Sequence, residues 1–337
     1  MIPLKDTFWQ TESWQQQMSG MIRDPNLLLK RLQLNPNEHP DAAAAMRQFP
    51  LRVPEAFVAK MAVGDWNDPL LLQVLPLAQE SQEQVGYVND PLEEANANPT
   101  PGLIHKYHGR VLLITSPACA IHCRYCFRRN FPYEANNPSQ RDWQQTLNYI
   151  ADRPEITEVI LSGGDPLSAP DEYLHKLITK IAAIKHVDTL RIHTRLPLVL
   201  PARISPELVK VLSDHRLRTV MVVHCNHANE IDVHTATALA ALHHAGITLL
   251  NQSVLLKGIN NDVGTLVNLS RRLFEVQVMP YYLHLLDKVR GAAHFDVNDV
   301  QAQTLMNGIL AKLPGYLVPR LVIEKPSASS KRPLALF

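Results

Sequence analysis

The sequence Val111-Leu-Leu-Ile-Thr-Ser-Pro-Ala-Cys119-Ala-Ile-His-Cys123-Arg-Tyr-Cys126 joins a short apolar run to three closely spaced cysteines. The apolar run is typical of a buried strand, and a loop directly after it would hold three thiolates around one small volume at the mouth of a sheet. Thiolates are soft ligands that select iron–sulfur clusters, zinc or copper(I). A [4Fe–4S] cluster normally takes four cysteines, whereas the remaining one, Cys225, lies roughly a hundred residues further on. The motif therefore predicts a cluster with three protein ligands and one iron open to a small molecule.

Two other interpretations of the cysteines stay open from the residues alone. Free cysteines are often small buried hydrophobic residues, and three thiolates together with His122 or His105 could bind zinc. Structural zinc sites usually pair their ligands at two short spacings, however, and no second Cys-x-x-Cys follows in this chain. The cluster is therefore the favoured interpretation, and Cys225 is expected to be a core residue.

From residue 110 onward, apolar runs alternate with amphipathic stretches. The expected strands are 111–115, 156–161, 189–193, 219–223, 248–254 and 278–285. The expected helices are 143–151, 171–184, 206–213, 233–245, 263–274 and 298–313. Such alternation implies βαβ units and a parallel sheet, which right-handed crossovers would curl into a barrel or part of one. We expect an α/β fold, a partial (β/α)6 barrel resembling a TIM barrel, with its site at the C-terminal ends of the strands.

The domain organisation follows from changes in composition along the chain. Residues 1–100 have short helical stretches and a proline-containing linker, residues 101–313 contain the barrel pattern, and residues 314–337 form a C-terminal segment. We expect these three parts to be a helical N-terminal region, the barrel, and a short piece that completes the site. An extended stretch is expected at 316–324.

Composition and charge exclude several functional classes. The net charge is +1 and the two signs are interleaved, so no field would recruit nucleic acid or an anionic membrane. The start of the chain lacks the order of a signal peptide, and no apolar run approaches the ~18 residues of a membrane span. Three of the four cysteines share one motif, which argues for a reducing compartment. We expect a cytoplasmic protein with no nucleic-acid or membrane partner.

Several groups of residues near the expected rim could carry chemistry. Ser162-Gly163-Gly164-Asp165 follows the second strand, and glycines without Cβ atoms would let the backbone approach a ligand and offer its amides. Lys106 and Arg110 either form a solvated edge or hold a phosphate. Arg128 is suited to a substrate carboxylate, and Asp287 would be an acid facing the same rim. By position alone, Lys331 would be an exposed lysine of the tail.

Together these segments resemble the lysine 2,3-aminomutases, a family of radical S-adenosylmethionine enzymes. The resemblance is carried by the cysteine motif with Phe-Arg128-Arg129, Ser-Gly-Gly-Asp-Pro-Leu, Arg191-Ile-His-Thr-Arg-Leu-Pro, Asn226-His-Ala-Asn-Glu230, Leu250-Asn-Gln-Ser-Val-Leu-Leu256 and Pro280-Tyr-Tyr-Leu-His-Leu-Leu-Asp287. It runs in order from about residue 50 to the end of the sequence. The implied cofactors are a [4Fe–4S] cluster, S-adenosylmethionine and pyridoxal 5'-phosphate.

The resemblance assigns a role to each matching position. It implies cluster ligation by Cys119, Cys123 and Cys126, and an S-adenosylmethionine site formed by Tyr125, Ser162, Gly163, Gly164, Asp165 and His224. It implies that Lys331 is catalytic and holds pyridoxal phosphate as a Schiff base, with Lys106, Tyr107 and Arg110 at the phosphate and Gln252 near the ring. Finally, it implies that Arg128 binds the carboxylate of the substrate lysine and that Asp287 and Glu324 bind its side-chain ammonium group.

The chain also departs from the family pattern. Glutamate stands at 324 where the free-standing enzymes have aspartate, serine and alanine replace glycines before Lys331, and the cysteine-rich extension that binds structural zinc does not follow. Asp262 occupies the loop of another zinc ligand, so no zinc is expected. These departures, and the segment Leu285–Phe295, match the elongation factor P (R)-β-lysylation branch of the family.

That branch implies conversion of (S)-α-lysine to (R)-β-lysine, which a partner ligase attaches to elongation factor P. It also implies an electron donor such as flavodoxin or ferredoxin, and suggests a homo-oligomer. An aminomutase for another amino acid or for protein-linked lysine remains open, as does a noncatalytic iron–sulfur electron carrier. Against the carrier stand Lys331, Lys106 and Arg110, which such a protein would not need.

Overall fold

The computed structural model describes residues 8–38, 42–134, 136, 140–326 and 328–334. In these ranges the strands form one nine-stranded sheet in which spatial order follows chain order. The strands are β1 (Leu103–Tyr107), β2 (Arg110–Ser116), β3 (Glu158–Gly163), β4 (Thr189–Thr194), β5 (Arg218–Val223), β6 (Thr248–Val254), β7 (Met279–His284), β8 (Arg320–Ile323) and β9 (Arg332–Pro333). Each of β2 to β7 pairs in parallel with the strand that follows it, which makes β2 to β8 a run of seven parallel strands. The antiparallel strands β1 and β9 lie at the two edges and do not pair with each other, so the barrel is partial.

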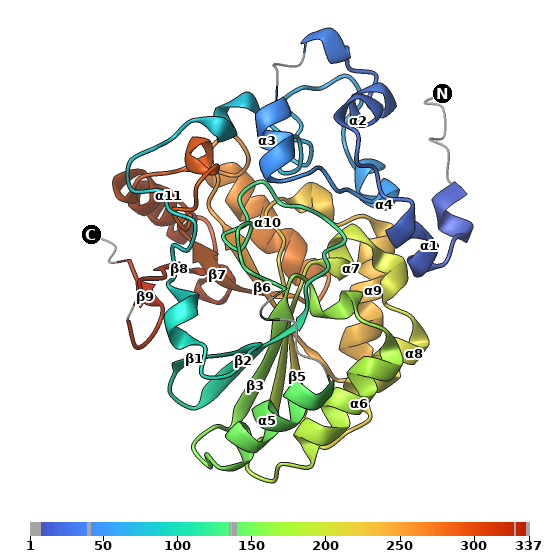
Figure 1. Ribbon diagram of the computed structural model, residues 1–337. Helices are drawn as coiled ribbons and strands as arrows, with labels where there is room; N and C mark the ends of the chain where they lie inside the picture. Colours follow the sequence, from blue (N-terminus) through green and yellow to red (C-terminus); the bar gives the residue numbers. More distant parts are fainter. Residues whose placement is uncertain (1–7, 39–41, 135, 137–139, 327, 335–337) are drawn as a thin grey trace.

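Helices cover the outside of this sheet and one end of it (Figure 1). The helices are α1 (Trp14–Ser19), α2 (Pro25–Arg31), α3 (Ala43–Gln48), α4 (Glu55–Val58), α5 (Gln140–Ala151), α6 (Asp171–Ala182), α7 (Leu196–Val199), α8 (Pro206–Ser213), α9 (Val233–His244), α10 (Val263–Glu275) and α11 (Asp299–Leu310). Short 3-10 helices are η1 (Phe8–Thr11), η2 (Pro36–Glu38), η3 (Ala78–Ser81), η4 (Glu94–Ala97), η5 (Pro166–Ser168), η6 (Pro201–Arg203), η7 (Ala228–Glu230), η8 (Ala293–Phe295) and η9 (Gly315–Leu317). The six expected strands correspond to β2–β7 and the six expected helices to α5, α6, α8, α9, α10 and α11, which confirms the α/β partial-barrel prediction.

Helix starts follow the local sequence. Asp232, Asp262 and Asn298 each accept a hydrogen bond from a backbone N–H in the first turn, at the starts of α9, α10 and α11. Such caps satisfy donors that the helix leaves unpaired. Asp262, expected to stand where relatives bind zinc, is thus the N-cap of α10.

The two edge strands, β1 and β9, were not expected from the sequence. Strand β1 has only two apolar residues before His105-Lys106-Tyr107, too few to indicate a strand. It forms a hairpin with β2 through Gly109, whose φ of +76° favours glycine. The stretch expected to be extended at 316–324 contains η9 and β8, so β8 adds a seventh parallel strand.

The N-terminal helices share a core with the barrel. Leu28, Phe57 and Leu71 from the N-terminal region belong to the same buried hydrophobic cluster as Leu161 of β3 and Ile192 of β4. A second cluster joins α10 and α11 to β7 and β8. The compositional boundary near residue 100 therefore runs through one continuous core, and the three-part domain division stays a prediction.

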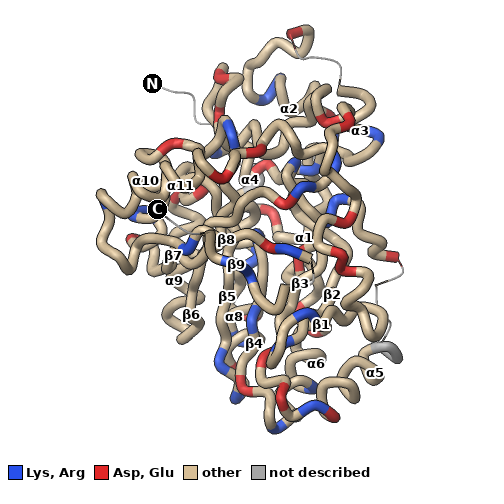
Figure 2. The backbone as a smooth tube through the Cα atoms, turned by 90° about the vertical axis from the view of Figure 1, so that its left-hand side faces the viewer, with Lys and Arg blue, Asp and Glu red and all other residues tan. Residues whose placement is uncertain are grey.

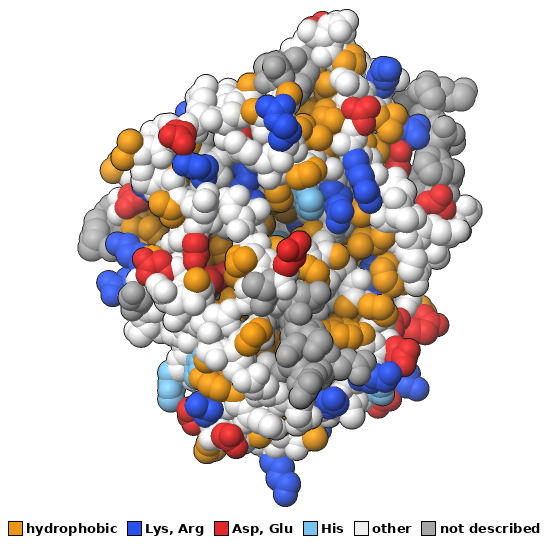
Figure 3. Space-filling model, viewed as in Figure 1, with side chains coloured by type: hydrophobic (Ala, Val, Ile, Leu, Met, Phe, Trp, Pro, Cys, Tyr) orange, Lys and Arg blue, Asp and Glu red, His pale blue; other side chains and the backbone are white. Residues whose placement is uncertain are grey.

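Charges of both signs are spread along the whole chain (Figure 2). On the face drawn in Figure 3, acidic, basic and hydrophobic side chains are intermixed. In the part of the chain that the structure describes, no helix combines the length and the apolar character that a membrane crossing requires.

Candidate active site

The cysteine loop leaves the C-terminal end of β2 and is fixed by residues of the N-terminal region. The N–H of His122 donates to the carbonyl of Arg52 at 2.9 Å, and the N–H of Arg124 donates to the carbonyl of Gln73 at 2.9 Å. Arg52 in turn donates from Nη1 to the carbonyl of Cys119 at 3.1 Å. The loop therefore presents its three cysteines on a backbone held from outside the barrel.

A buried ion triad holds the same loop. Arg124 donates to both oxygens of Glu80 at 2.9 and 2.6 Å, and Arg129 donates to Glu80 at 2.8 Å. Arg124 and Glu80 are fully buried and the Arg129 side chain is 3% exposed. Both guanidinium groups also lie over the ring of Phe49, at 5.0 and 4.8 Å from its centre. Glu80 belongs to η3, so this Arg124–Glu80–Arg129 triad links the cysteine loop to the N-terminal region.

The three motif cysteines are free and of intermediate exposure, and their thiols are near enough to affect one another's pKa. Burial, and then the neighbouring thiols Cys126 and Cys123, raise the pKa of Cys119 well above its usual value. Burial and Cys123 raise the pKa of Cys126 to about 12. Bound iron would offset the burial and the mutual repulsion that disfavour the thiolate forms here.

The arrangement fits a cluster better than a single zinc ion. The histidines that a zinc site would need have other partners. His122 donates from its ring to the carbonyl of Pro50 at 2.8 Å and stacks on Phe49. The Nδ1 atom of His105 lies within hydrogen-bond distance, 2.9 Å, of the Tyr149 hydroxyl. The two histidines considered as zinc ligands are thus engaged elsewhere.

The glycine turn after β3 packs against the cysteine loop. A Cβ on Gly163 would lie 2.5 Å from the carbonyl oxygen of Ser116, and one on Gly164 would lie 2.6 Å from that of Ala118. The N–H groups of Gly164 and Asp165 donate to those same carbonyls at 2.7 and 2.8 Å. These two N–H groups are therefore used within the protein, and the glycines allow a close approach between two backbone segments.

Asp165 connects this turn to the end of β4. Its carboxylate accepts from Thr194 Oγ1 at 2.8 Å, from the N–H of Arg195 at 2.8 Å and from the N–H of Leu167 at 3.0 Å. Burial raises its pKa to about 6 although these donors act to lower it. Asp165 thereby fixes the positions of neighbouring strand ends.

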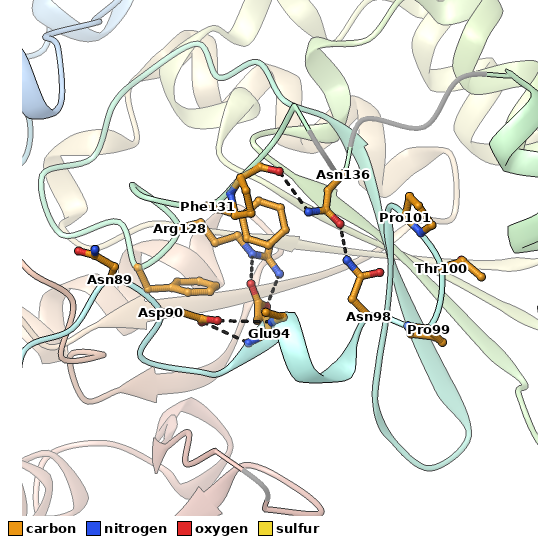
Figure 4. Close-up of a pocket in the computed structure, with 13 residues that line it drawn as sticks. Asn89, Asp90, Glu94, Asn98, Pro99, Thr100, Pro101, Arg128, Phe131 and Asn136 are labelled. Carbon is orange, nitrogen blue, oxygen red and sulfur yellow. Dashed lines mark hydrogen bonds and ion pairs between the residues drawn. The ribbon is translucent and has the colours of Figure 1, made fainter.

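Arg128, on the cysteine loop, meets an acid that the sequence did not reveal. Its Nε and Nη2 donate to the two oxygens of Glu94 at 2.8 and 2.7 Å, and both side chains are 7% exposed (Figure 4). Its Nη1 donates to Ser162 Oγ at 3.0 Å. Arg128 and Glu94 both line a cavity of about 310 Å³ between η4 and the cysteine loop. Lys331, Asp287 and Glu324 do not line that cavity.

A second charged cluster gathers residues from β1, from the position directly after β8 and from the segment before β9. Lys106 and Tyr107 both contact Glu324 Oε1, at 3.1 and 2.9 Å, and Lys331 Nζ lies 2.6 Å from Glu324 Oε2. Arg110 lies over the Tyr107 ring at 4.7 Å from its centre. Although burial opposes it, the ion pair and hydrogen bond with Lys331, followed by Lys106 and Tyr107, lower the pKa of Glu324. The structure thus brings together four positions from both ends of the barrel sequence, with Arg110 beside them.

Asp287 adjoins this cluster, as its electrostatic interactions with Glu324, Lys331 and Lys106 indicate. Burial, then the carboxylates of Glu324 and Glu94, raise its pKa to about 7, against the opposing effects of Lys331 and Lys106. A carboxyl group held near neutrality in a charged site is typical of a functional acid.

Uncharged polar groups line the region between the two clusters. The side-chain amide Nε2 of Gln252 on β6 donates to Nε2 of His224 at 3.0 Å. The rings of His193 and His224 meet edge to face, with 5.6 Å between their centres. Burial lowers the pKa of His224 to about 3 and that of His193 well below its usual value. In the described part of the chain, Gln252 Oε1, His193 Nε2 and His284 Nε2 are buried without a hydrogen-bond partner. Such atoms suit a polar ligand, since buried polar groups are rarely left unpaired.

The remaining expected positions lie nearby. The Tyr125 hydroxyl accepts from Asn226 at 2.6 Å and donates to Gln73 at 3.3 Å. Cys225 is fully buried in the main hydrophobic cluster and donates to the carbonyl of His227, so its expected place in the core is confirmed.

The fold and the cysteine loop define a radical S-adenosylmethionine enzyme, and the Radical SAM superfamily model matches residues 113–269. The L-lysine 2,3-aminomutase of Escherichia coli (strain K12) is 48% identical over 326 residues, 96% of this chain and 95% of that protein. The L-lysine 2,3-aminomutase of Haemophilus influenzae is 47% identical over 324 residues, 96% of each chain. That of Clostridium subterminale is 34% identical and aligns with 98% of this chain and 79% of its own length. The chain belongs to the L-lysine 2,3-aminomutase family and is an isomerase.

Family membership implies a [4Fe–4S] cluster and S-adenosylmethionine, as expected from the motif. Three further residues of the site escaped the sequence reasoning: Glu94, Arg195 and Glu80. Glu94 lies in a linker with no periodic pattern, and Glu80 lies in a loop-rich stretch, so neither had a local signal. Arg195 lay inside a quoted family motif, Arg191–Pro197, but no partner for it was visible from sequence.

Proposed function

We propose that this protein is a pyridoxal phosphate-dependent lysine 2,3-aminomutase that converts (S)-α-lysine to (R)-β-lysine. The observation that carries the proposal is the convergence of Lys331, Lys106 and Tyr107 on Glu324, with Asp287 beside them. An amine, cationic and phenolic donors, and two acids in one place match what a phosphorylated aldehyde cofactor and a diamino acid require. The relatives named above are L-lysine 2,3-aminomutases, which supports the same reaction.

In this proposal Cys119, Cys123 and Cys126 hold the cluster, and Tyr125, Ser162, Gly163, Gly164, Asp165 and His224 form the S-adenosylmethionine site. The close contact of Gly163 and Gly164 with the backbone before Cys119 supports this S-adenosylmethionine site, because it brings the glycine turn and the cysteine loop together. Asp165 would act by fixing the turn, since its oxygens accept three hydrogen bonds from the protein itself. The neutral ring of His224 can accept or donate a hydrogen bond without carrying charge.

Lys331 would attach pyridoxal phosphate covalently, with its phosphate near Lys106, Tyr107 and Arg110 and its ring near Gln252. The geometry suits this: β1 and β2 form a hairpin that presents the first three, and Gln252 has a free buried oxygen in the described structure. When bound, the cluster and S-adenosylmethionine supply hydrogen-atom abstraction, and pyridoxal phosphate delocalises the unpaired electron during migration of the amino group. The chain's own residues orient these groups and exclude water.

Arg128 at one end and the acids Asp287 and Glu324 at the other would bind the substrate by its carboxylate and its side-chain ammonium. Two fixed ends position the reacting carbons between them, which is the positioning that rearrangement needs. In this structure Nε and Nη2 of Arg128 donate to Glu94. A substrate carboxylate would therefore bind the remaining N–H groups of Arg128 or displace Glu94. Glu324 would leave Lys331 once that lysine bears the cofactor.

We further propose that the β-lysine is destined for elongation factor P, through a ligase that attaches it to a lysine of that factor. The resemblance of Leu285–Phe295 to the (R)-β-lysylation branch supports this step. A flavodoxin or ferredoxin would supply the electron. Four free cysteines suit a reducing compartment such as the cytoplasm. In this proposal the N-terminal region, residues 1–100, supports the cysteine loop. Residues 101–313 form the barrel, and residues 314–337 carry the lysine that binds pyridoxal phosphate.

The test is an anaerobic assay of reconstituted protein with S-adenosylmethionine, pyridoxal phosphate, dithionite and (S)-lysine, followed by chiral chromatography. We expect (R)-β-lysine from the wild type and from Lys312→Ala, an exposed lysine outside the site, and none from Lys331→Ala. Formation of 5'-deoxyadenosine without β-lysine would refute free lysine as the substrate. The next assay would then use elongation factor P that carries lysine. Absence of both products with an intact cluster would refute the enzymatic proposal.

A further inference from the structure

Arg195 lies between the cysteine loop and the end of β4 and has no role in the function proposed above. It follows β4 directly and is 5% exposed. Its Nη1 donates to Cys123 Sγ at 2.8 Å, and its Nη2 donates to Gln73 Oε1 at 2.5 Å and Glu230 Oε2 at 3.0 Å. Its backbone N–H donates to Asp165 at 2.8 Å. One residue thus contacts a cluster ligand with its side chain and the Gly-Gly-Asp turn with its backbone.

The guanidinium is held rigidly in this place. Glu230 is fully buried, and its Oε1 accepts from the N–H groups of Asn226 and His227 at 2.9 and 3.1 Å and from Gln73 Nε2 at 3.2 Å. The carboxylate is therefore fixed by neighbours other than Arg195. The guanidinium also lies over the rings of Phe57 and Tyr125, at 5.3 and 5.8 Å from their centres.

We propose that Arg195 is a positioning residue that raises the reduction potential of the cluster through its hydrogen bond to Cys123. Adding an electron to a cluster increases the negative charge on its sulfur ligands. An N–H donor and a positive charge at a ligand sulfur favour that form, and hydrogen bonds and net charge are recognised determinants of cluster potentials. The electron comes from a separate one-electron reductant, dithionite in the test, and Arg195 keeps its protons throughout.

The proposal predicts a measurable shift of potential in Arg195 variants. Reconstituted wild type, Arg195→Lys and Arg195→Gln would be titrated with dithionite and followed by electron paramagnetic resonance, without S-adenosylmethionine, pyridoxal phosphate or lysine. For Arg195→Gln we expect at least a tenfold lower reduced-to-oxidised ratio at a given potential, a negative shift of about 59 mV for a one-electron couple. Arg195→Lys should shift less, since it keeps the charge.

Arg203→Gln is the matched control, because Arg203 is another buried arginine, but its partners are the carbonyls of Leu167 and Ala169 and the carboxylate of Asp171. Its potential should equal that of the wild type. An unshifted potential in iron-replete Arg195→Gln, or an equal shift in Arg203→Gln, overturns the proposal.

A second measurement uses only the wild type and so does not depend on the folding of a variant. In protein labelled with arginine that carries 15N only in the guanidinium group, which leaves the backbone N–H groups of Arg124 and Arg128 unlabelled, pulsed resonance of the reduced cluster should detect hyperfine coupling to a guanidinium nitrogen, and absence of that coupling overturns the proposal. The inference rests on the cysteine loop holding a cluster but not on the substrate. Failure of the aminomutase assay and failure of this proposal are therefore distinguishable.

Discussion

Replacing Asp287 by asparagine should stabilise the cofactor-free protein at alkaline pH. The side chain lies where burial and the carboxylates of Glu324 and Glu94 raise its pKa to about 7. An acid with a higher pKa in the folded than in the unfolded chain holds its proton more tightly when folded. Stability therefore falls as pH rises between the two pKa values, and falls no further above the folded one.

The size of the effect follows from that interval. An unfolded aspartate has a pKa of about 3.9, so the shift is about 3 units and its upper limit is about 4 kcal/mol at 1.36 kcal/mol per unit. Because Asp287 remains partly exposed to solvent, which screens its charge, we expect about 2 to 3 kcal/mol. The whole loss falls between about pH 4 and pH 7.

Urea unfolding of cofactor-free wild type and Asp287→Asn from pH 4 to pH 8.5 measures this difference. The two proteins should match near pH 4, and the variant should become more stable up to about pH 7 and keep that advantage above it. Asp262→Asn, an exchange at the exposed N-cap of α10, should alter stability little, since asparagine is also a good cap. In the loaded enzyme, Asp287→Asn should raise KM for lysine. Parallel pH profiles for wild type and Asp287→Asn would refute the reasoning.

Three further outcomes are expected. Lys331→Ala should lose borohydride-reducible pyridoxal absorbance while keeping its iron content; full incorporation of the cofactor would contradict the role of Lys331. Gly164→Ala places a Cβ 2.6 to 2.8 Å from backbone atoms of Ala118 and Pro117, so it should unfold at several °C lower temperature and bind less iron, and an unchanged melting curve would show that the two segments separate freely. Cys225→Ala should keep full iron content and lose about 1 kcal/mol of stability, as expected for a small core residue; loss of iron would make Cys225 a ligand.

The barrel could be predicted because its signals are local. Buried parallel strands such as β3 (Glu158–Gly163) are continuous apolar runs, and the helices between them begin at capping residues such as Asp232. Residues at strand ends could be placed on one rim for the same reason. The edge strands escaped prediction because β1 is half polar and β9 has only two residues.

The contacts inside the site could not be predicted, because they join segments far apart in the chain. Glu94 meets Arg128 across 34 positions, and Lys106 meets Glu324 across 218. The family resemblance identified Arg128, Lys106, Glu324 and Lys331 as site positions but did not reveal that the first is bound to Glu94 or that the other three converge. The sequence also did not reveal that the glycine turn packs directly against the backbone of residues 116–118.

The Arg124–Glu80–Arg129 triad has a consequence for dissecting or transplanting the catalytic barrel. A fragment cut near residue 101 would keep both arginines but lose Glu80, leaving two buried cations without their counter-charge. Breaking a buried pair in this way costs about 3 to 5 kcal/mol, comparable to much of the net stability of a typical domain. The loop that carries the cysteines would then lose its anchor although every cysteine remained. Any minimal version of this enzyme must therefore include the segment around η3, or replace Arg124 and Arg129 with neutral residues that fill the same volume.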